Sequence, residues 1–421
     1  METLIVSVFI IGYLAIIFEP IISINKSAIA LVTGVLCWVV YILWSGNNTF
    51  VAAQFATHFT DLSGILFFLI GAMTIVELID AHNGFDVISA IISTNNKVKL
   101  LWIVCLFTFF LSAVLDNLTT TIVLITLLRK LIADKKDRLL FVGMVIIAAN
   151  CGGAWSPIGD ITTTMLWVGG QISAKNIVSH LFLPSLISLL VPLLIVSLKL
   201  SGNTNKIVVK PKFTNALFER NLVFIIGIGA LLFVPVFKSI TQLPAFMGML
   251  FGLGVLWIIT ELIHNKKEQD EKNTLSVVAA LQKIDVPSIL FFLGILIAVA
   301  ALQATGLLTQ VAHFLNTHIG NLNIIVSIIG VLSAFIDNVP LVAATMGMYD
   351  INTYPQDSYL WEFIAYCAGT GGSILIIGSA AGVTAMGMEK IDFMWYLKNI
   401  TWLALISYFA GIVCYMCLYK A

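Results

Sequence analysis

Two stretches of this sequence, SAVLDNLTTTIVL at residues 112–124 and SAFIDNVPLVAAT at residues 333–345, place an Asp-Asn pair inside an apolar run. The pairs are Asp116-Asn117 and Asp337-Asn338. A carboxylate beside a carboxamide is costly at membrane depth, and ionisable residues that persist there usually serve function. The repeated pair therefore predicts a site that binds or moves ions.

The composition assigns the chain to a membrane. Of its 421 residues 59% are hydrophobic and only 10% are charged, and the mean hydropathy is +1.02. An average soluble domain carries about 25% charged residues. The 22 basic and 22 acidic residues cancel, so bulk charge gives no support for a nucleic-acid partner. We therefore expect an all-α polytopic membrane protein.

Hydrophobic runs of about 17 to 25 residues are typical of helices that cross a bilayer. Such spans are predicted at residues 3–22, 27–44, 62–80, 138–170, 180–199, 221–238, 244–263, 286–304, 358–390 and 395–418. Two further apolar units, 98–131 and 322–348, carry the Asp-Asn pairs. Each unit returns the chain to the side that it left, whether it is a re-entrant hairpin or a pair of full spans, so the other loops keep their sidedness.

The basic residues orient these spans. With the loops alternating across the membrane, all of the 22 lysines and arginines except Lys175, Lys238 and Lys420 fall on one side. Cytoplasmic loops carry such an excess of basic residues. This side is therefore predicted to be cytoplasmic, and both termini extracytoplasmic.

The two halves of the chain resemble each other. CGGAWSPIGD at residues 151–160 aligns with TGGSILIIGS at residues 370–379. An odd number of crossings separates the two Asp-Asn units, so the second half is predicted to be inverted relative to the first. The predicted architecture is two inverted repeats of five spans, each with a re-entrant hairpin and a broken helix, as in secondary transporters. The predicted parts are a first repeat at 1–199 (hairpin 98–131, broken helix 138–170), a cytoplasmic linker at 200–220, and a second repeat at 221–421 (hairpin 322–348, broken helix 358–390).

Helix-breaking residues locate the two broken helices. NCGGAWSPIGDITTTM (150–165) interrupts one apolar run with three glycines, a proline and an aspartate, and AGTGGSILIIGS (368–379) is the matching interruption. Such openings are tolerated in a membrane where the freed backbone lines a polar cavity, and their carbonyl oxygens suit small cations. Alternatively, glycine-rich stretches permit close packing of helices.

Four carboxylates are predicted at membrane depth: Glu77, Asp116, Asp160 and Asp337. No lysine or arginine lies deep enough in a predicted span to pair with them. An unpaired carboxylate cannot stay ionised and empty in a low-dielectric site, so each must take up a proton or hold a cation. A site that alternates between the two is a minimal proton/cation exchanger, and cytoplasmic alkalinisation is expected to activate it. Glu77 has a second interpretation, as an interfacial residue beside Asp80.

Oxygen-bearing side chains accompany these carboxylates. The predicted ion- and proton-binding residues are Asp116, Asn117, Asn150, Asp160, Asp337 and Asn338. The predicted supporting polar residues are Thr119, Thr120, Ser156, Thr162, Thr163, Ser373, Ser379 and Glu77. Sodium or lithium suits this set better than a soft metal, and sodium is predicted at Asp116, Asp160 and Asp337. Each hydroxyl taken singly, however, is more often bonded to a backbone carbonyl of its own helix.

The histidines and cysteines receive structural interpretations. The six cysteines lie in apolar stretches and are predicted to pack in the core. His82 follows a span end and is a candidate for proton uptake, given the titration range of histidine. The other histidines are predicted to be solvated.

Four segments resemble the signature segments of the NhaD-type sodium/proton antiporters, within the ion transporter superfamily: SAVLDNLTTTIV, NCGGAWSPIGDITTTMLW, SAFIDNVPLVAA and GTGGSILIIGSAAG. The resemblance covers almost the whole chain. It implies a transporter of Na⁺, Li⁺ and H⁺ in the bacterial cell (inner) membrane, with no cofactor and no enzymatic activity; the superfamily often forms homodimers. It also implies ion-binding or relay positions, which are Asp116, Asn117, Asn150, Asp160, Thr162, Thr163, Asp337 and Asn338.

Three alternative functions share some of these features. A sodium-coupled dicarboxylate carrier of the same superfamily resembles the chain in outline but carries Ser-Asn-Thr at the hairpin tips. Aspartate replaces that serine twice here, and two added negative charges without a deep arginine disfavour an anionic substrate. An arsenite extruder is harder to dismiss because its substrate is neutral. An intramembrane hydrolase that uses Asp116 and Asp337 as a catalytic pair is disfavoured by the repeated Asn partners.

Overall fold

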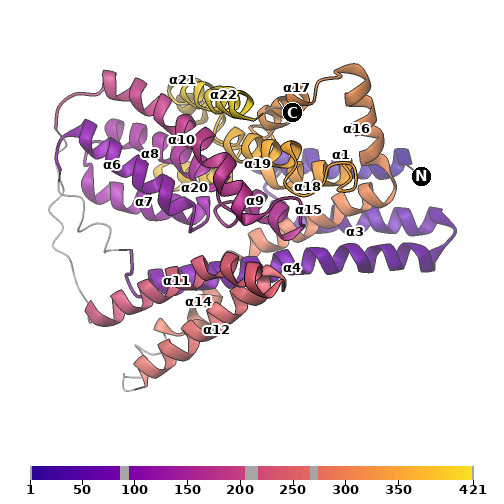
Figure 1. Ribbon diagram of the computed structural model, residues 1–421, viewed down its shortest axis with the longest axis horizontal. Helices are drawn as coiled ribbons and strands as arrows, with labels where there is room; N and C mark the ends of the chain where they lie inside the picture. The colour runs from indigo at the N-terminus through magenta and orange to yellow at the C-terminus, as the bar shows by residue number, and fades with distance from the viewer. Residues whose placement is uncertain (1, 86–93, 204–216, 266–273, 420–421) are drawn as a thin grey trace.

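The computed structural model describes residues 2–85, 94–203, 217–265 and 274–419, which are helical apart from turns and one isolated β-bridge (Figure 1). The helices of the first half are α1 (Glu2–Ile17), α2 (Glu19–Ile22), α3 (Lys26–Ser45), α4 (Asn48–Ala81), α6 (Lys97–Ser112), α7 (Asn117–Leu131), α8 (Lys135–Ala154), α9 (Ile161–Val168) and α10 (Ala174–Lys199). The helices of the second half are α11 (Leu217–Thr241), α12 (Ala245–His264), α14 (Val277–Lys283), α15 (Val286–Ala304), α16 (Leu307–His318), α17 (Leu322–Leu332), α18 (Asn338–Met348), α19 (Tyr359–Gly371), α20 (Ala380–Glu389), α21 (Phe393–Asn399) and α22 (Thr401–Leu418).

Eight helices of the described residues are long and apolar enough to cross a membrane: α3, α4, α8, α10, α11, α12, α15 and α22. Their outer faces carry large exposed apolar side chains such as Leu43, Leu198 and Ile258. Lipid tails are as apolar as these side chains, so the exposed apolar surface is compatible with a bilayer. The chain is therefore an all-α, multi-pass membrane protein, as the composition predicts.

The helix bounds differ from the predicted spans in several places. The span predicted at 62–80 is the last part of α4, a helix of 34 residues. The first turns of α4 contain polar residues, so the prediction began too late. The span predicted at 3–22 is divided, because α1 ends at Ile17 and the short α2 begins with Glu19. The helices α14 and α16 were not predicted at all, since both are too short to be found as apolar spans.

Each Asp-Asn pair starts a helix. The aspartates are the N-cap residues of α7 and α18: the Asp116 carboxylate accepts from the backbone N–H of Thr119 at 2.7 Å, and Asp337 accepts from that of Val339 at 3.2 Å. Aspartate is a favoured N-cap because its oxygens satisfy the free N–H groups of the first turn. The preceding helices, α6 and α17, end a few residues earlier, so each pair lies at a turn between two helices.

The two glycine-rich stretches interrupt helices, as predicted. One interruption separates α8 from α9 and the other separates α19 from α20. Asp160 caps α9 and Ser379 caps α20. Every residue of α8 from Phe141 to its end is buried, and the same holds for α19 from Leu360. The interruptions therefore lie in the core of the protein.

Glycine at the interruptions lets helix backbones meet. A Cβ atom at Gly152 would overlap the backbone carbonyl of Phe109 in α6, and a Cβ atom at Gly371 would overlap the carbonyl of Gly330 in α17. The two contacts are equivalent, because each joins an interrupted helix to the helix that precedes an Asp-Asn pair. Only a residue without a side chain fits at either position.

The helices form two groups in space (Figure 1). One group contains α6 to α10 with α19, α20 and α22, which contact one another. In the second group α4 packs against α11, α12 and α15. The ends of α7, α9 and α20 that carry the polar residues lie within the first group, and α18 contacts α9 and α19 of that group as well as α15.

Candidate functional site

A buried cluster of carboxylate and amide groups surrounds Asp160, whose side chain is 2% exposed. One carboxylate oxygen, Oδ1, accepts from the backbone N–H and from the hydroxyl of Thr162, both at 2.9 Å. The other, Oδ2, accepts from the amide of Asn117 at 2.7 Å and lies 3.5 Å from the amide nitrogen of Asn338. Both Asp-Asn pairs thus contribute their asparagine to one carboxylate.

Asn150 extends the cluster toward α20. Its Oδ1 accepts from the Asn117 amide at 3.0 Å, and its own amide donates to the Ser379 hydroxyl at 3.1 Å. Asn150 is fully buried near the end of α8, and Ser379 caps α20. The cluster therefore joins residues of both interrupted helices and both Asp-Asn turns.

Asp116 and Asp337 lie beside this cluster rather than in it. The Asp116 carboxylate caps the first turn of α7. It accepts from the backbone N–H and from the hydroxyl of Thr119, each at 2.7 Å. Asp337 caps α18 by accepting from the backbone N–H of Val339 at 3.2 Å. Both side chains are half-buried, and both are close enough to interact electrostatically with Asp160. Three carboxylates thus share one region of the core.

The electrostatics of this region come from carboxylates and dipoles. Among the described residues no lysine, arginine or histidine forms an ion pair with Asp116, Asp160 or Asp337. The N-termini of α7, α9, α18 and α20 meet here, and their partial positive charges stabilise carboxylates. A partial charge does not replace a counterion for a buried carboxylate.

The supporting hydroxyls have unequal roles. Thr119 and Thr162 contact carboxylates, and Ser379 contacts Asn150. By contrast, the hydroxyls of Thr163 and Ser373 donate to carbonyls three residues earlier, a common local role of hydroxyls. The Ser156 hydroxyl, between α8 and α9, donates to the carbonyl of Ala113, which follows α6. Thr120 is buried in the first turn of α7, and its hydroxyl has no hydrogen-bond partner in the described part of the chain.

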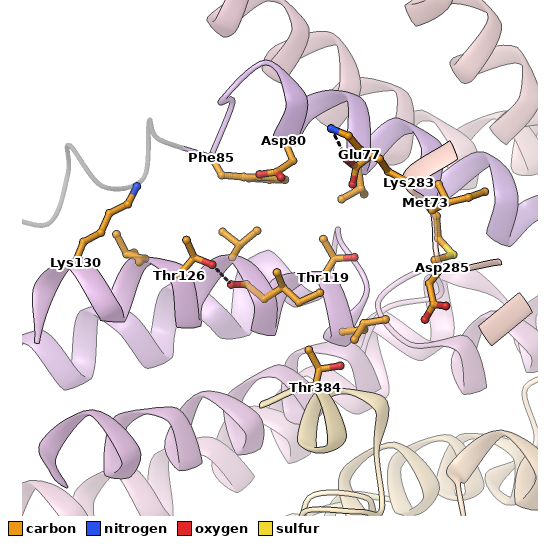
Figure 2. Close-up of a pocket in the computed structure, with 16 residues that line it drawn as sticks. Met73, Glu77, Asp80, Phe85, Thr119, Thr126, Lys130, Lys283, Asp285 and Thr384 are labelled. Atoms are coloured by element: carbon orange, nitrogen blue, oxygen red, sulfur yellow. Dashed lines mark hydrogen bonds and ion pairs between the residues drawn. The ribbon is translucent and has the colours of Figure 1, made fainter. Parts of the chain in front are cut away.

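Glu77 is separate from the cluster. It lies 3.5 Å from the ammonium of Lys283, which corrects the prediction that no basic residue lies near enough to pair with it. Lys283 ends the short helix α14, and this helix was not predicted from the sequence. Both residues line a cavity of about 330 Å³ (Figure 2).

Two of the histidines predicted to be solvated are paired. His264 is buried and its Nε2 lies 3.1 Å from that of His82, which is itself fully buried. His180 Nδ1 lies 2.7 Å from the carboxylate of Glu362. His82, the candidate for proton uptake, is thus packed against α12 and bonded to the Leu78 carbonyl at 2.7 Å.

An ion-pair cluster around a second buried carboxylate, which was not predicted from the sequence, joins the two halves. Glu389, at the end of α20, is 2% exposed and pairs with Arg129 at 2.6 Å and with Arg138 at 3.0 Å. Arg129 also donates to the carbonyl of Met388. The two arginines lie near predicted loop ends, and no local pattern in the sequence pairs them with a glutamate so distant in the chain.

The sequence is similar to known transporters over almost its whole length. Residues 13–363 match the citrate transporter family, CitMHS. The chain is 50% identical to sodium/proton antiporter 1 of Arabidopsis thaliana over 412 residues, which are 97% of this chain and 71% of that protein. It is 50% identical to sodium/proton antiporter 2 of the same plant, covering 97% of this chain and 98% of that protein.

A bacterial relative is also similar along its length. The chain is 30% identical to the Na⁺/H⁺ antiporter NhaD of Vibrio cholerae over 446 residues, which cover 98% of this chain and 90% of that protein. These matches confirm the resemblance seen in the signature segments. The buried Asp160 cluster is assembled from those segments. The chain is therefore a member of the NhaD-type sodium/proton antiporter family, within the ion transporter superfamily.

Proposed function

We propose that this protein exchanges cytoplasmic sodium or lithium for external protons, and that both ions use the carboxylates around Asp160. The observation that carries the proposal is the Asp160 carboxylate, buried and bonded to neutral donors, with no basic partner among the described residues. Neutral amides compensate only part of the cost of burying a charge. A proton or a cation supplies the rest.

Competition between the two ions is what makes the site an exchanger. A protonated Asp160 has lost the charge that attracts sodium, and a bound sodium disfavours protonation. If the site opens to one side of the membrane at a time, each passage of sodium outward is followed by a passage of protons inward. Asp116 and Asp337 lie beside Asp160, so we assign the exchanged ions to the three carboxylates together and not to one residue.

The ligand chemistry of the cluster favours a hard cation. Every polar atom is an oxygen or an amide, and carboxylate, amide and hydroxyl oxygens suit small hard cations. Asn117 and Asn338 turn their amide nitrogens to Asp160, and rotation of the same side chains presents their oxygens. The buried Thr120 hydroxyl, which lacks a partner in the described part of the chain, lies one helical turn after Asn117. We assign it as a further oxygen ligand.

We infer that the two halves are inverted repeats, at 1–199 and 221–421, joined by the linker 200–220. The equivalent glycine contacts of Gly152 and Gly371 support this repeat. In this arrangement α6–α7 and α17–α18 are re-entrant hairpins that enter from opposite sides, and their tips meet near the middle of the membrane. The excess of basic residues places the linker in the cytoplasm and both termini outside.

The transported ions are the only partners that the proposal requires. A homodimer is compatible with it, and no cofactor is invoked. The relatives include plant as well as bacterial proteins, so the bacterial cell membrane remains a prediction for this chain.

The match to a citrate transporter family raises a second candidate, a sodium-coupled carrier of citrate or a dicarboxylate. Such a substrate carries several negative charges and calls for basic groups. In the described residues the cluster offers carboxylates and no ion-paired lysine or arginine. Exchange of sodium for protons fits these charges better.

The test is fluorescent monitoring of proton movement in everted vesicles after addition of sodium, lithium or potassium across a pH series. The native chain is compared with Asp116→Asn and Asp337→Asn, and with Thr74→Val in α4 as a control, since the Thr74 hydroxyl only bonds to the carbonyl of its own helix. We expect sodium- and lithium-dependent dequenching that both aspartate variants lose and the control keeps. Retained exchange in both aspartate variants contradicts the site, and citrate-driven sodium uptake without proton movement contradicts the function.

A further inference from the structure

A cavity of about 330 Å³ lies between the two groups of helices (Figure 2). One wall consists of α4 and of the junction between α14 and α15, which contributes Lys283 and Asp285. The opposite wall consists of α7, with Thr384 of α20. The cavity thus separates a helix that starts at an Asp-Asn pair from the group that contains α4.

A stripe of side chains on α7 runs along this cavity. Its members are Thr119, Val123, Thr126 and Lys130, spaced three or four residues apart and therefore on one face of the helix. The stripe ends at Lys130 in the last turn of α7, and Asp80 in the last turn of α4 lines the same cavity. This end lies on the side of the membrane to which the basic residues assign the cytoplasm.

The other end of the stripe reaches the carboxylates. Thr119 lines the cavity, and its hydroxyl donates to the carboxylate of Asp116 at 2.7 Å. A second, smaller and mainly apolar cavity of about 50 Å³ shares Met73, Val76 and Leu118 with the first and is lined by Asp116 itself. The linings of the two cavities together therefore extend from Lys130 to Asp116, and the inner cavity is small and mainly apolar.

The equivalent region of the second half is arranged differently. Gly347 of α18 lies against Leu308 and Gln303 of the helices that cover it. The cavity near this end of α18 is lined by residues 346–351, 353 and 354. Residue 346 is nine positions from Asp337, or roughly 13 Å along a helix. The route to the carboxylates is thus built on α7 and not on α18 in this conformation.

The size and charge of the cavity along α7 suit a hydrated cation. Its volume is many times what one water molecule needs. Glu77, Asp80 and Asp285 line it together with Lys130 and Lys283, and Glu77 and Lys283 form an ion pair. The acidic groups outnumber the basic ones, so the cavity admits small cations more readily than anions.

We propose that this cavity is the cytoplasmic access route by which hydrated sodium reaches Asp116, and that the structure is the conformation open to the cytoplasm. The proposal rests on the proposed function and on the orientation of the chain. It assigns to Thr126 and Thr384, which lie outside the Asp160 cluster, positions on the path of the ion.

Accessibility of single cysteines tests the route. In a chain whose six cysteines are replaced, Thr126→Cys and Thr384→Cys are treated with a positively charged, membrane-impermeant methanethiosulfonate in everted and in right-side-out vesicles. Ile103→Cys is the control, because Ile103 of α6 is 40% exposed and lies at a similar distance from its helix end. We expect both cavity cysteines to react in everted vesicles at least tenfold faster than the control, with loss of exchange.

The outcomes separate the route from the function. Reaction at the rate of the control, or only in right-side-out vesicles, overturns the route if the cysteine-free parent exchanges sodium for protons. A native chain without such exchange overturns the function. If the cysteine-free parent does not fold, Thr126→Trp and Ile103→Trp are made in the native chain instead. Exchange is compared at equal amounts of the two variants in the membrane. Thr126→Trp fills the route and is expected to slow exchange tenfold or more, whereas Ile103→Trp is not. Equal rates for the two contradict the route.

Discussion

The amide nitrogen of Asn117 lies 2.7 Å from Oδ2 of Asp160, although the two residues belong to different helices, α7 and the start of α9. The same amide also donates to Asn150. Asn117 therefore holds a buried carboxylate and an amide in fixed positions. At the proposed site, a cation at Asp160 needs only a rotation of the Asn117 side chain to gain the amide oxygen, so little further conformational entropy is lost on binding.

Asn117→Ala should weaken sodium binding without abolishing expression. Loss of one partner of a buried polar group costs about 1–3 kcal/mol, and about 1.4 kcal/mol corresponds to a tenfold change in affinity. We therefore expect the sodium concentration for half-maximal exchange to rise about tenfold or more. The measurement is exchange in proteoliposomes as a function of sodium concentration. An unchanged half-saturation, with the protein folded, would remove Asn117 from the binding site.

Acidification should raise the sodium concentration needed for half-maximal exchange. If sodium and a proton compete for the same carboxylates, the apparent sodium affinity falls about tenfold for each pH unit below the titration of the group when one proton is displaced. The maximal rate at saturating sodium should change much less. Sodium titrations at a series of pH values, with equal pH on both sides of the membrane, give both quantities. A fall in the maximal rate at constant half-saturation would indicate that protons act at a separate site.

The fold could be predicted from sequence where a single segment carries the signal. The apolar runs and the glycine-rich interruptions are local features, and the structure shows the predicted breaks between α8 and α9 and between α19 and α20. The long α4 was shortened in the prediction because its first turns contain polar residues. The helices α14 and α16 were missed because both are too short to be found as apolar spans.

The candidate site was predicted as a set of residues but not as an arrangement. The prediction gave Asp116, Asp160 and Asp337 equal roles. In the structure only Asp160, of these three, is bonded to both Asn117 and Asn338, and Asp116 and Asp337 cap α7 and α18. Which side chain of an Asp-Asn pair faces the core depends on helix packing, and residue types alone do not fix it. Helix packing also brings Lys283 to Glu77 and His264 to His82, and residue types alone do not predict these pairs.

Glu389→Gln should destabilise the protein more than the loss of an exposed ion pair. Glu389 is buried, whereas Arg129 is 46% and Arg138 17% exposed, so the cost should exceed the about 0–1 kcal/mol of an exposed pair but stay below the about 3–5 kcal/mol of a fully buried one. The matched control is Asp137→Asn, which removes the partly exposed pair with Lys97 at 2.6 Å; such pairs contribute about 0–1 kcal/mol. The measurement is the melting temperature of the purified protein in detergent, which should fall markedly only for Glu389→Gln.

A charge exchange tests whether the pair itself is responsible. The double variant Arg129→Glu with Glu389→Arg keeps one pair of opposite charges between α7 and α20. It should recover part of the stability that either single variant loses. If the double variant is as unstable as the sum of the two singles, the residues act independently and not as a pair.

Gly152→Ala and Gly371→Ala should each prevent the close approach of two helices. The added methyl group would overlap the backbone carbonyl of Phe109 or of Gly330, and backbone atoms of packed helices cannot move aside as a flexible side chain can. Overpacking of this kind costs about 1–3 kcal/mol or more. The control is Gly229→Ala in α11, where a Cβ atom meets nothing within 4 Å, and where alanine is the better helix former. Yield of monodisperse protein after solubilisation should fall for the first two variants and stay constant or rise for the control. Because the two contacts are equivalent in the two halves, the two losses should be similar, and a loss confined to one half would contradict the proposed repeat.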